Sequence, residues 1–276
     1  MMKKFQSFWF SNAIAKEKNI TINQLKENIN ADICIVGGGY TGLWTAIKIK
    51  EKKPTTNIVI IEKDLCGSGA SGRNGGCMIP LSSKFPAMKK IVGTKDAIKM
   101  VKASEEALNA IKQFCEINNL DAQIRINGIV YSATNNKHRG GFDNLLKDLN
   151  ENNINSWERF SKEKIQKLTG SNRNIDGYFS PIGGSLQPAL LVRGLKEIAE
   201  KKGIKIFEHS AMSSYEDSQK ITVRTAHGSV ECKKLVLAIN AWTPSFFSFL
   251  SRSVILVSSD MIISEPINNE LEKVSK

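Results

Sequence analysis

A glycine-rich turn between two apolar segments is the feature that most constrains this chain. Residues 32–36 are an apolar run of strand-forming residues, and an apolar pattern with helical spacing resumes at Leu43. Gly37, Gly39 and Gly42 lie between them at G-x-G-x-x-G spacing, which permits a tight turn, close approach to a pyrophosphate and close helix packing. The segment therefore predicts strand, turn and helix, with an anion site at the helix N-terminus.

An acidic residue after the next strand strengthens this interpretation. Residues 58–61 form a second apolar run that ends in Glu62, twenty residues after Gly42. A carboxylate at this place can accept both ribose hydroxyls of an adenosine, and its charge disfavours a cofactor with a ribose phosphate. We therefore expect a dinucleotide-binding domain, and the alternative is an ordinary strand-to-helix turn.

Composition limits the class of protein. The chain has 276 residues, 41% hydrophobic and 24% charged, which is typical of one large globular domain or two smaller ones. Its net charge of +12 would suit a nucleic-acid or anionic-membrane partner, but the lysines are spread singly and are not interleaved with aromatic residues. We therefore predict no nucleic-acid partner. We also predict no membrane span, because no segment approaches about 20 consecutive apolar residues.

The cysteines and histidines suggest neither a metal site nor a nucleophile. The five cysteines are odd in number and lack a C-x-x-C pair, which argues for a reducing compartment, hence a cytoplasmic location, and against a zinc site. No histidine is paired with a carboxylate or cysteine at a recognisable spacing. The sequence thus predicts no metal and leaves the catalytic residues unassigned. The residues concerned are Cys34, Cys66, Cys77, Cys115, Cys232, His138, His209 and His227.

The N-terminal segment resembles a secretory signal only superficially. Lys3 and Lys4 precede the aromatic triplet 8–10, but polar residues interrupt the apolar stretch, which is shorter than a signal requires. We expect residues 1–31 to be a soluble leader that packs its aromatic side chains on the first domain.

A second glycine-rich stretch follows Glu62. Half of residues 67–76 are glycines, so this segment is unsuited to the interior of a helix or strand. Arg73 offers fixed hydrogen-bond donors and Asn74 offers both a donor and an acceptor. These residues favour a loop that approaches a phosphorylated or flat ligand, and the alternative is a flexible linker.

Together, the segments 37–43 (GGGYTGL) and 70–76 (ASGRNGG) resemble the D-amino-acid-oxidase-type family of FAD-dependent oxidoreductases. The resemblance implies FAD as cofactor, not NAD, with the glycine turn and Glu62 at the ADP half and loop 70–76 running past the pyrophosphate towards the flavin. It also implies that residue 212 contacts the adenine through its backbone and that segment 240–242 closes the site near the phosphates. The residues assigned to the cofactor are Gly37, Gly39, Tyr40, Thr41, Gly42, Glu62, Lys63, Ala70, Ser71, Arg73, Asn74, Gly75, Gly76, Met212, Ala238, Asn240 and Trp242.

The rest of the chain suggests two kinds of structure. Helical and strand patterns between residues 96 and 185 lack a βαβ rhythm, as expected of an inserted substrate domain. Pro188 then begins an amphipathic helix, and Gln187 before it is a candidate substrate-facing residue that a helix-capping role explains equally well. The patterns predict helices at 95–114, 142–149, 162–169 and from 188 to about 202, and strands at 124–132, 204–207, 213–215, 221–225 and 235–239. The resemblance implies a further strand at 254–263, which would enter the substrate sheet.

These patterns and the resemblance imply an α/β fold. It would comprise a Rossmann-like FAD-binding domain of the glutathione-reductase type and an inserted, incomplete antiparallel-sheet substrate domain. We assign residues 32–95 and 186–245 to the former, and 96–185 and 246–276 to the latter. Family members continue further than residue 276, so we expect a chain that is C-terminally truncated relative to the family, with a complementing polypeptide as a possible partner.

The resemblance implies oxidation of a C–N bond of a small-molecule amine or amino acid by hydride transfer to FAD. One alternative is a non-catalytic flavin-binding fragment or the N-terminal half of a split oxidoreductase. The other is an NAD-dependent dehydrogenase, which the Arg73-Asn74 loop disfavours. Substrate identity, the electron acceptor, the mode of flavin attachment and the oligomeric state stay open at this stage.

Overall fold

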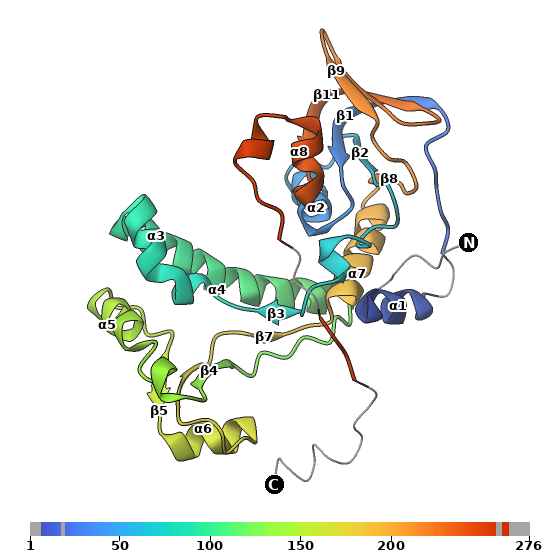
Figure 1. Cartoon of the computed structure of the whole chain (residues 1–276). Coiled ribbons are helices and arrows are strands. Elements are labelled where there is room, and N and C mark those ends of the chain that lie inside the picture. Colours follow the sequence, from blue (N-terminus) through green and yellow to red (C-terminus); the bar gives the residue numbers. More distant parts are fainter. Residues whose placement is uncertain (1–6, 18–19, 258–260, 265–276) are drawn as a thin grey trace. The chain divides into compact units, whose positions relative to one another are not determined.

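The computed structural model describes residues 7–17, 20–257 and 261–264. These residues form two compact units (Figure 1), which are described separately below. Unit 1 lies within Met1–Gly75 and Gln187–Met261, and unit 2 lies within Gly76–Leu186 and Ile262–Lys276. The units differ from the predicted domains in that residues 76–95 lie in unit 2, whereas the described leader and residues 246–257 lie in unit 1.

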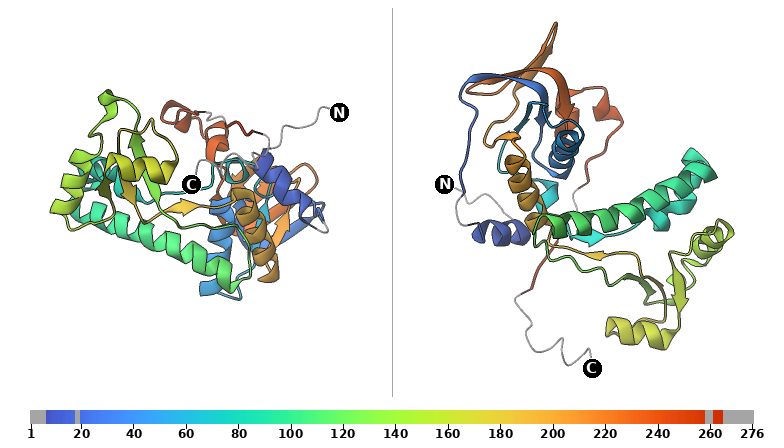
Figure 2. Two further views of the ribbon diagram at one scale, coloured as in Figure 1. Left: turned by 90° about the horizontal axis from the view of Figure 1, so that it is seen from below. Right: turned by 180° about the vertical axis from the view of Figure 1, so that it is seen from behind.

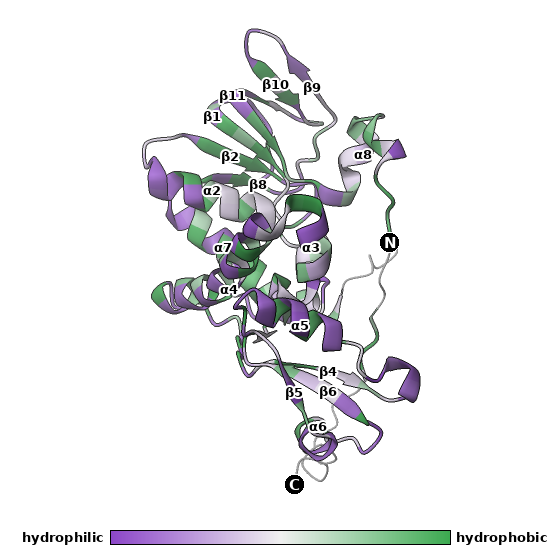
Figure 3. Ribbon diagram, turned by 90° about the vertical axis from the view of Figure 1, so that its left-hand side faces the viewer, coloured by the Kyte–Doolittle hydropathy of each residue, from purple (hydrophilic) through white to green (hydrophobic). Residues whose placement is uncertain are grey.

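Unit 1 is built on a six-stranded mixed sheet with the order β8-β2-β1-β11-β10-β9. Four neighbouring strands are parallel, and two further strands continue the sheet as an antiparallel extension. The central strands are hydrophobic (Figure 3), as expected for strands covered on their faces. The parallel strands are β1 (Asn28–Val36), β2 (Ile58–Ile61), β8 (Lys205–Phe207) and β11 (Ser229–Leu237), and the antiparallel strands are β9 (Ser214–Asp217) and β10 (Ile221–Arg224).

Three helices of unit 1 pack one on another, and one of them contacts the sheet. Helix α2 (Tyr40–Lys52) contacts β1 and β2 and lies beside α7 (Pro188–Lys201), as both views in Figure 2 show. Helix α1 (Phe8–Ala15) packs on α7 and buries Phe10. Phe10 thus packs within unit 1, whereas Phe8 of the same aromatic triplet is exposed, and the segment ends where β1 begins.

Unit 2 combines helices with small antiparallel sheets. Strands β4 (Ile129–Ala133), β6 (Asp176–Ser180) and β5 (Glu158–Phe160) form one sheet in that order. Buried residues of this unit, among them Phe85, Trp157 and Tyr178, form its core. The remaining elements are α3 (Phe85–Val92), α4 (Thr94–Ile117), α5 (Asp143–Glu151), α6 (Lys162–Thr169), β3 (Cys77–Met78) and β7 (Gly184–Ser185).

Three predicted strands differ from the structure. Strand β4 begins only at Ile129, because the preceding Gly128 has a φ of +86° that interrupts an extended strand. Strand β11 begins earlier than predicted and ends at Leu237, where the chain turns into a 3-10 helix, Asn240–Trp242, and then α8 (Thr243–Phe246). The described part of 254–263 forms no strand, because no described strand pairs with it.

Candidate dinucleotide site

The glycine turn lies where β1 passes into α2. The N–H of Gly37 donates to the carbonyl oxygen of Ile61, 2.9 Å away, which fixes the turn to β2. Gly37 has a φ of +112°, a conformation that side chains other than glycine rarely adopt. A Cβ atom at Gly42 would overlap the carbonyl oxygen of Gly37. The first and third glycines of the motif are therefore required by the backbone of the turn itself.

The N-terminus of α2 retains free backbone donors. Its N-cap residue, Gly39, has no side chain that could cap the helix. Ser71 supplies a cap from the second loop, because the N–H of Tyr40 donates to Ser71 Oγ at 2.9 Å. The N–H groups of Thr41 and Gly42 make no hydrogen bond with the part of the chain that the structure describes. Together with the helix dipole, these two groups provide an anion site.

Glu62 lies beside the glycine turn, at the end of β2. Its Oε2 accepts from the N–H of Gly38 at 2.8 Å, and its Oε1 accepts from the N–H of Asp64 at 3.0 Å. Burial raises the pKa of the Glu62 carboxyl above its ordinary value, and these two hydrogen bonds oppose the rise. Each carboxylate oxygen has a further lone pair, so the held carboxylate can still accept a hydroxyl hydrogen bond.

The loop at residues 67–76 is organised by its own polar groups. Arg73 Nε donates to the Ser68 carbonyl at 2.6 Å, and Asn74 Nδ2 donates to the carbonyls of Ala70 and Ser71 at 3.1 and 3.0 Å. These side chains stabilise the loop that the sequence predicted to approach the ligand. Gly76 belongs to unit 2, where its carbonyl accepts from the N–H of Leu186.

The segment after β11 returns to the glycine turn. The N–H of Ala238 donates to the carbonyl oxygen of Val36 at 2.8 Å. The carbonyl oxygen of Ala238 lies so close to Gly37 that a side chain at position 37 would not fit. Asn240 has a φ of +45° and begins the 3-10 helix that carries Trp242. Lys63 Nζ lies 3.3 Å from the centroid of the Trp242 ring, a cation–π contact between residues far apart in sequence.

Met212 has a buried side chain and unpaired backbone groups. The side chain belongs to the core of unit 1. Its N–H and carbonyl form no hydrogen bond within the described residues. The side chain of Met212 thus serves the core, and its backbone keeps a donor and an acceptor for another group.

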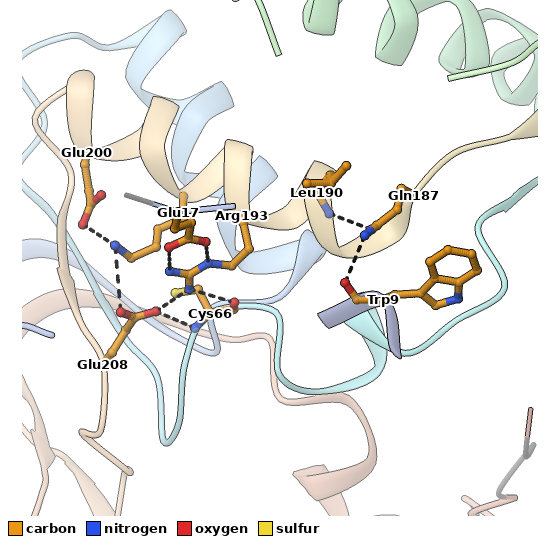
Figure 4. A network of polar contacts seen from close by, with 9 residues as sticks. Trp9, Glu17, Cys66, Gln187, Leu190, Arg193, Glu200 and Glu208 are labelled. Carbon is orange, nitrogen blue, oxygen red and sulfur yellow. Dashed lines mark hydrogen bonds and ion pairs between the residues drawn. The ribbon is translucent and has the colours of Figure 1, made fainter. Parts of the chain in front are cut away.

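Gln187 caps helix α7, which is one of the two alternatives that the sequence left open for this residue. Its Oε1 accepts from the N–H of Leu190 at 2.8 Å, and its Nε2 donates to the Trp9 carbonyl at 3.0 Å (Figure 4). The side chain is 3% exposed, and both ends of its amide bind within unit 1. The capping alternative explains the residue, because an amide bound at both ends has little capacity left for a substrate.

Sequence reasoning missed a buried ionic network. Arg193 lies in an otherwise apolar stretch of α7 and pairs with Glu208, and a charge inside such a stretch was the available signal. Within the described residues, no group of three or more histidine, cysteine or acidic side chains is arranged to hold a metal ion. No disulfide joins any of the five cysteines, all of which lie in the described part of the chain, and no helix described there is long and apolar enough to cross a membrane.

Comparison with known families decides the assignment. The family model of FAD-dependent oxidoreductases of the DAO type matches residues 32–275. This chain belongs to that family. The family depends on FAD, so the cofactor expected for the glycine turn is FAD, in agreement with the prediction from segments 37–43 and 70–76.

Two curated relatives are similar to this chain over most of its length. Gamma-glutamylputrescine oxidoreductase of Escherichia coli (strain K12) is 29% identical over 239 residues, which covers 83% of this chain and 54% of that protein. A probable oxidoreductase, OrdL, of Haemophilus influenzae is 26% identical over 273 residues, covering 95% of this chain and 61% of that protein. The chain thus spans a little over half the length of these two relatives.

Solved structures show the same fold. The L-amino acid deaminase from Proteus vulgaris superposes with a TM-score of 0.67 at 22% identity, over 85% of this chain and 52% of that one. Glycine oxidase from Bacillus cereus ATCC 14579 gives a TM-score of 0.62 at 19% identity, over 80% and 58%. The predicted α/β fold is therefore confirmed.

Proposed function

We propose that this chain binds FAD in unit 1 and serves in an oxidoreductase that oxidises a C–N bond of a small amine or amino acid. The observation that carries the proposal is the glycine turn, in which Gly42 packs on Gly37 and leaves free N–H groups at the start of α2. This turn fits a pyrophosphate, because it offers close backbone approach and unpaired donors, and the first turn of α2 carries no acidic residue of its own.

Named residues have distinct roles in this proposal. The N–H groups of Thr41 and Gly42 bind the pyrophosphate, and Glu62 accepts the ribose hydroxyls of the adenosine half. The unpaired backbone groups of Met212 bind the adenine edge. When bound, FAD would supply the hydride acceptor for the reaction. The names of the related amine and amino-acid enzymes support the substrate class.

Thermal unfolding with two cofactors tests the assignment. At an FAD concentration one hundred times its dissociation constant, binding to the native state alone contributes about 2.7 kcal/mol of stability. For a chain of this size we expect the melting temperature to rise by roughly 5 to 10 °C with FAD and to stay unchanged with NAD. Equal shifts with FAD and NAD would contradict the FAD assignment and favour the NAD-dependent alternative.

Substitution of Glu62 by Gln tests the ribose contact. The amide has a single acceptor oxygen, so one of the two backbone N–H groups that Glu62 now binds would face an NH₂ group instead. We expect FAD affinity to fall roughly tenfold, measured by quenching of flavin fluorescence. Glu51→Gln, on the outer end of α2, is the matched control and should bind FAD like the wild type.

A turnover assay separates the enzyme from a non-catalytic flavoprotein. The FAD-loaded chain is mixed with a panel of amines and amino acids, and reduction of the flavin is followed by its visible absorbance without oxygen. Bleaching by one substrate class supports C–N oxidation. Stable FAD binding without bleaching by any compound would instead favour the flavin-binding fragment. The complementing polypeptide stays a prediction.

A further inference from the structure

The glycine-rich loop 67–76 depends on the rest of unit 1 for its position. Its only regular element is the 3-10 turn Ala70–Gly72. The side chain of Arg73 binds the carbonyl of Ser68 within the same loop. Such local hydrogen bonds shape the loop without fixing it to the sheet, and glycines leave its backbone with large conformational freedom. Contacts from outside the loop must therefore determine where it lies.

Helix α1 supplies one set of these contacts. Ser7 Oγ donates to the carbonyl of Gly72 at 2.6 Å. The Phe10 ring, on a residue only 2% exposed, covers Gly72 so closely that a Cβ there would lie 2.9 Å from Phe10 Cδ2. Gln187 in turn holds α1 on α7 through the carbonyl of Trp9. Helix α1 and its N-cap residue Ser7 thus contact the middle of the loop, while Gln187 holds the helix on α7.

An ion pair supplies the second set, at the start of the loop (Figure 4). Glu17 and Arg193 form a two-point contact, with Nε to Oε1 at 2.6 Å and Nη2 to Oε2 at 2.8 Å. Arg193 Nη1 also donates to the carbonyl of Cys66 at 3.1 Å and to Glu208 Oε1 at 2.9 Å. Arg193 is 7% exposed, so these charge-assisted hydrogen bonds are strong.

Cys66 and the residue after it contact the glycine turn directly. Its Sγ lies directly behind Gly38, where it leaves no room for a side chain. The next residue, Gly67, donates its N–H to the carbonyl of Gly38 at 3.0 Å. A continuous series of contacts therefore runs from Glu17 through Arg193 and Cys66 to the turn that precedes α2.

We propose that helix α1 and Glu17 form an N-terminal clamp that positions loop 67–76 and the glycine turn for FAD. This inference rests on the proposed FAD binding. Ser7, Glu17 and Arg193 are positioning residues, because they act through the loop and the turn. In the clamp, loss of one contact frees the loop while the sheet and the core of unit 1 stay folded.

Hydrogen–deuterium exchange of the full chain without FAD tests the clamp directly. Glu17→Gln removes the charge that Arg193 binds, and Ser7→Ala removes the hydrogen bond to Gly72. In both variants we expect the amides of residues 66–72 to exchange roughly tenfold faster, while those of β1 and β2 keep the wild-type rate. Glu197→Gln breaks an exposed ion pair to Lys201 on the same α7 and should leave the loop unchanged. Wild-type exchange at 66–72 in both clamp variants would overturn the proposal.

The FAD dissociation rate gives a second readout. We expect FAD to leave both clamp variants roughly tenfold faster than the wild type or Glu197→Gln, while their melting temperatures without FAD stay close to that of Glu197→Gln. Wild-type dissociation rates in both variants would refute a positioning role. A wild-type chain that binds no FAD would refute the proposed function, whereas the exchange experiment on the same chain still decides whether the clamp orders the loop.

Discussion

Gly42→Ala should reduce FAD affinity by about a hundredfold, equivalent to about 2.8 kcal/mol. The added methyl group meets the carbonyl oxygen of Gly37, which is a backbone atom and cannot rotate away as a side chain would. The start of α2 must therefore move away from the turn, and overpacking of this kind typically costs 1–3 kcal/mol. This movement displaces the N–H groups of Thr41 and Gly42 from the pyrophosphate. Titration of the variant with FAD, followed by flavin fluorescence, measures the loss.

Gly69→Ala is the matched control for this experiment. Gly69 lies in the second loop with a φ of −79°, and a Cβ there meets no atom within 4 Å. We expect its FAD affinity to lie within twofold of the wild type. Gly39→Ala provides an intermediate case, because its Cβ would lie 2.9 Å from the movable Ser71 Oγ. Wild-type affinity in a folded Gly42→Ala variant would show that the diphosphate lies elsewhere.

Arg193→Leu should lower the free energy of unfolding by about 3–5 kcal/mol. The substitution leaves Glu208, which is 1% exposed, without its guanidinium partner. Lys196 Nζ, 3.9 Å from Glu208 Oε2, is too distant for a hydrogen bond, and that oxygen has no hydrogen-bond partner in the described structure. The buried carboxylate then keeps only the N–H of Cys66 and the ion pair with Lys196, which do not replace the guanidinium, so the native state loses stability. Urea denaturation followed by circular dichroism measures the change.

Two comparisons identify the cause of this destabilisation. Arg224→Leu breaks an exposed ion pair with Glu216 in the same unit and should cost less than about 1 kcal/mol. The double substitution Arg193→Leu with Glu208→Leu removes both buried charges and should recover much of the lost stability. A double variant that is less stable than Arg193→Leu would show that packing, not the unpaired charge, dominates.

Local patterns predicted many of the elements well. The run Ile58–Ile61 is a strand and Lys162–Thr169 is a helix that ends at Gly170, because each depends on residues close in sequence. The family resemblance implies a strand at 254–263, yet the described part of it is not a strand. A strand forms only with a hydrogen-bonded neighbour, and sequence composition does not reveal whether one is present.

The candidate site likewise combines features that local sequence predicts with features that depend on distant segments. The glycine spacing located the turn of residues 37–42, because a tight turn restricts which residue types fit. The cap that Ser71 provides to α2 and the contact of Lys63 with Trp242 were not predictable, because each joins segments that only the tertiary fold brings together. Gln187 was ambiguous for the opposite reason, since an amide before Pro188 suits both a cap and a substrate contact.

The pairing of β1 with β11 has a consequence for biosynthesis. Asn28 and Ser229 are neighbours in the sheet although 201 positions separate them in the chain. Residues 76–186 of unit 2 leave the ribosome as one uninterrupted stretch and can complete their contacts first. Strand β1 can pair with β2 early, but its other edge stays unpaired until β11 has been synthesised, while more than half of the polypeptide is translated. We therefore expect the nascent chain to fold unit 2 early and the sheet of unit 1 last, with the edge of β1 exposed in between.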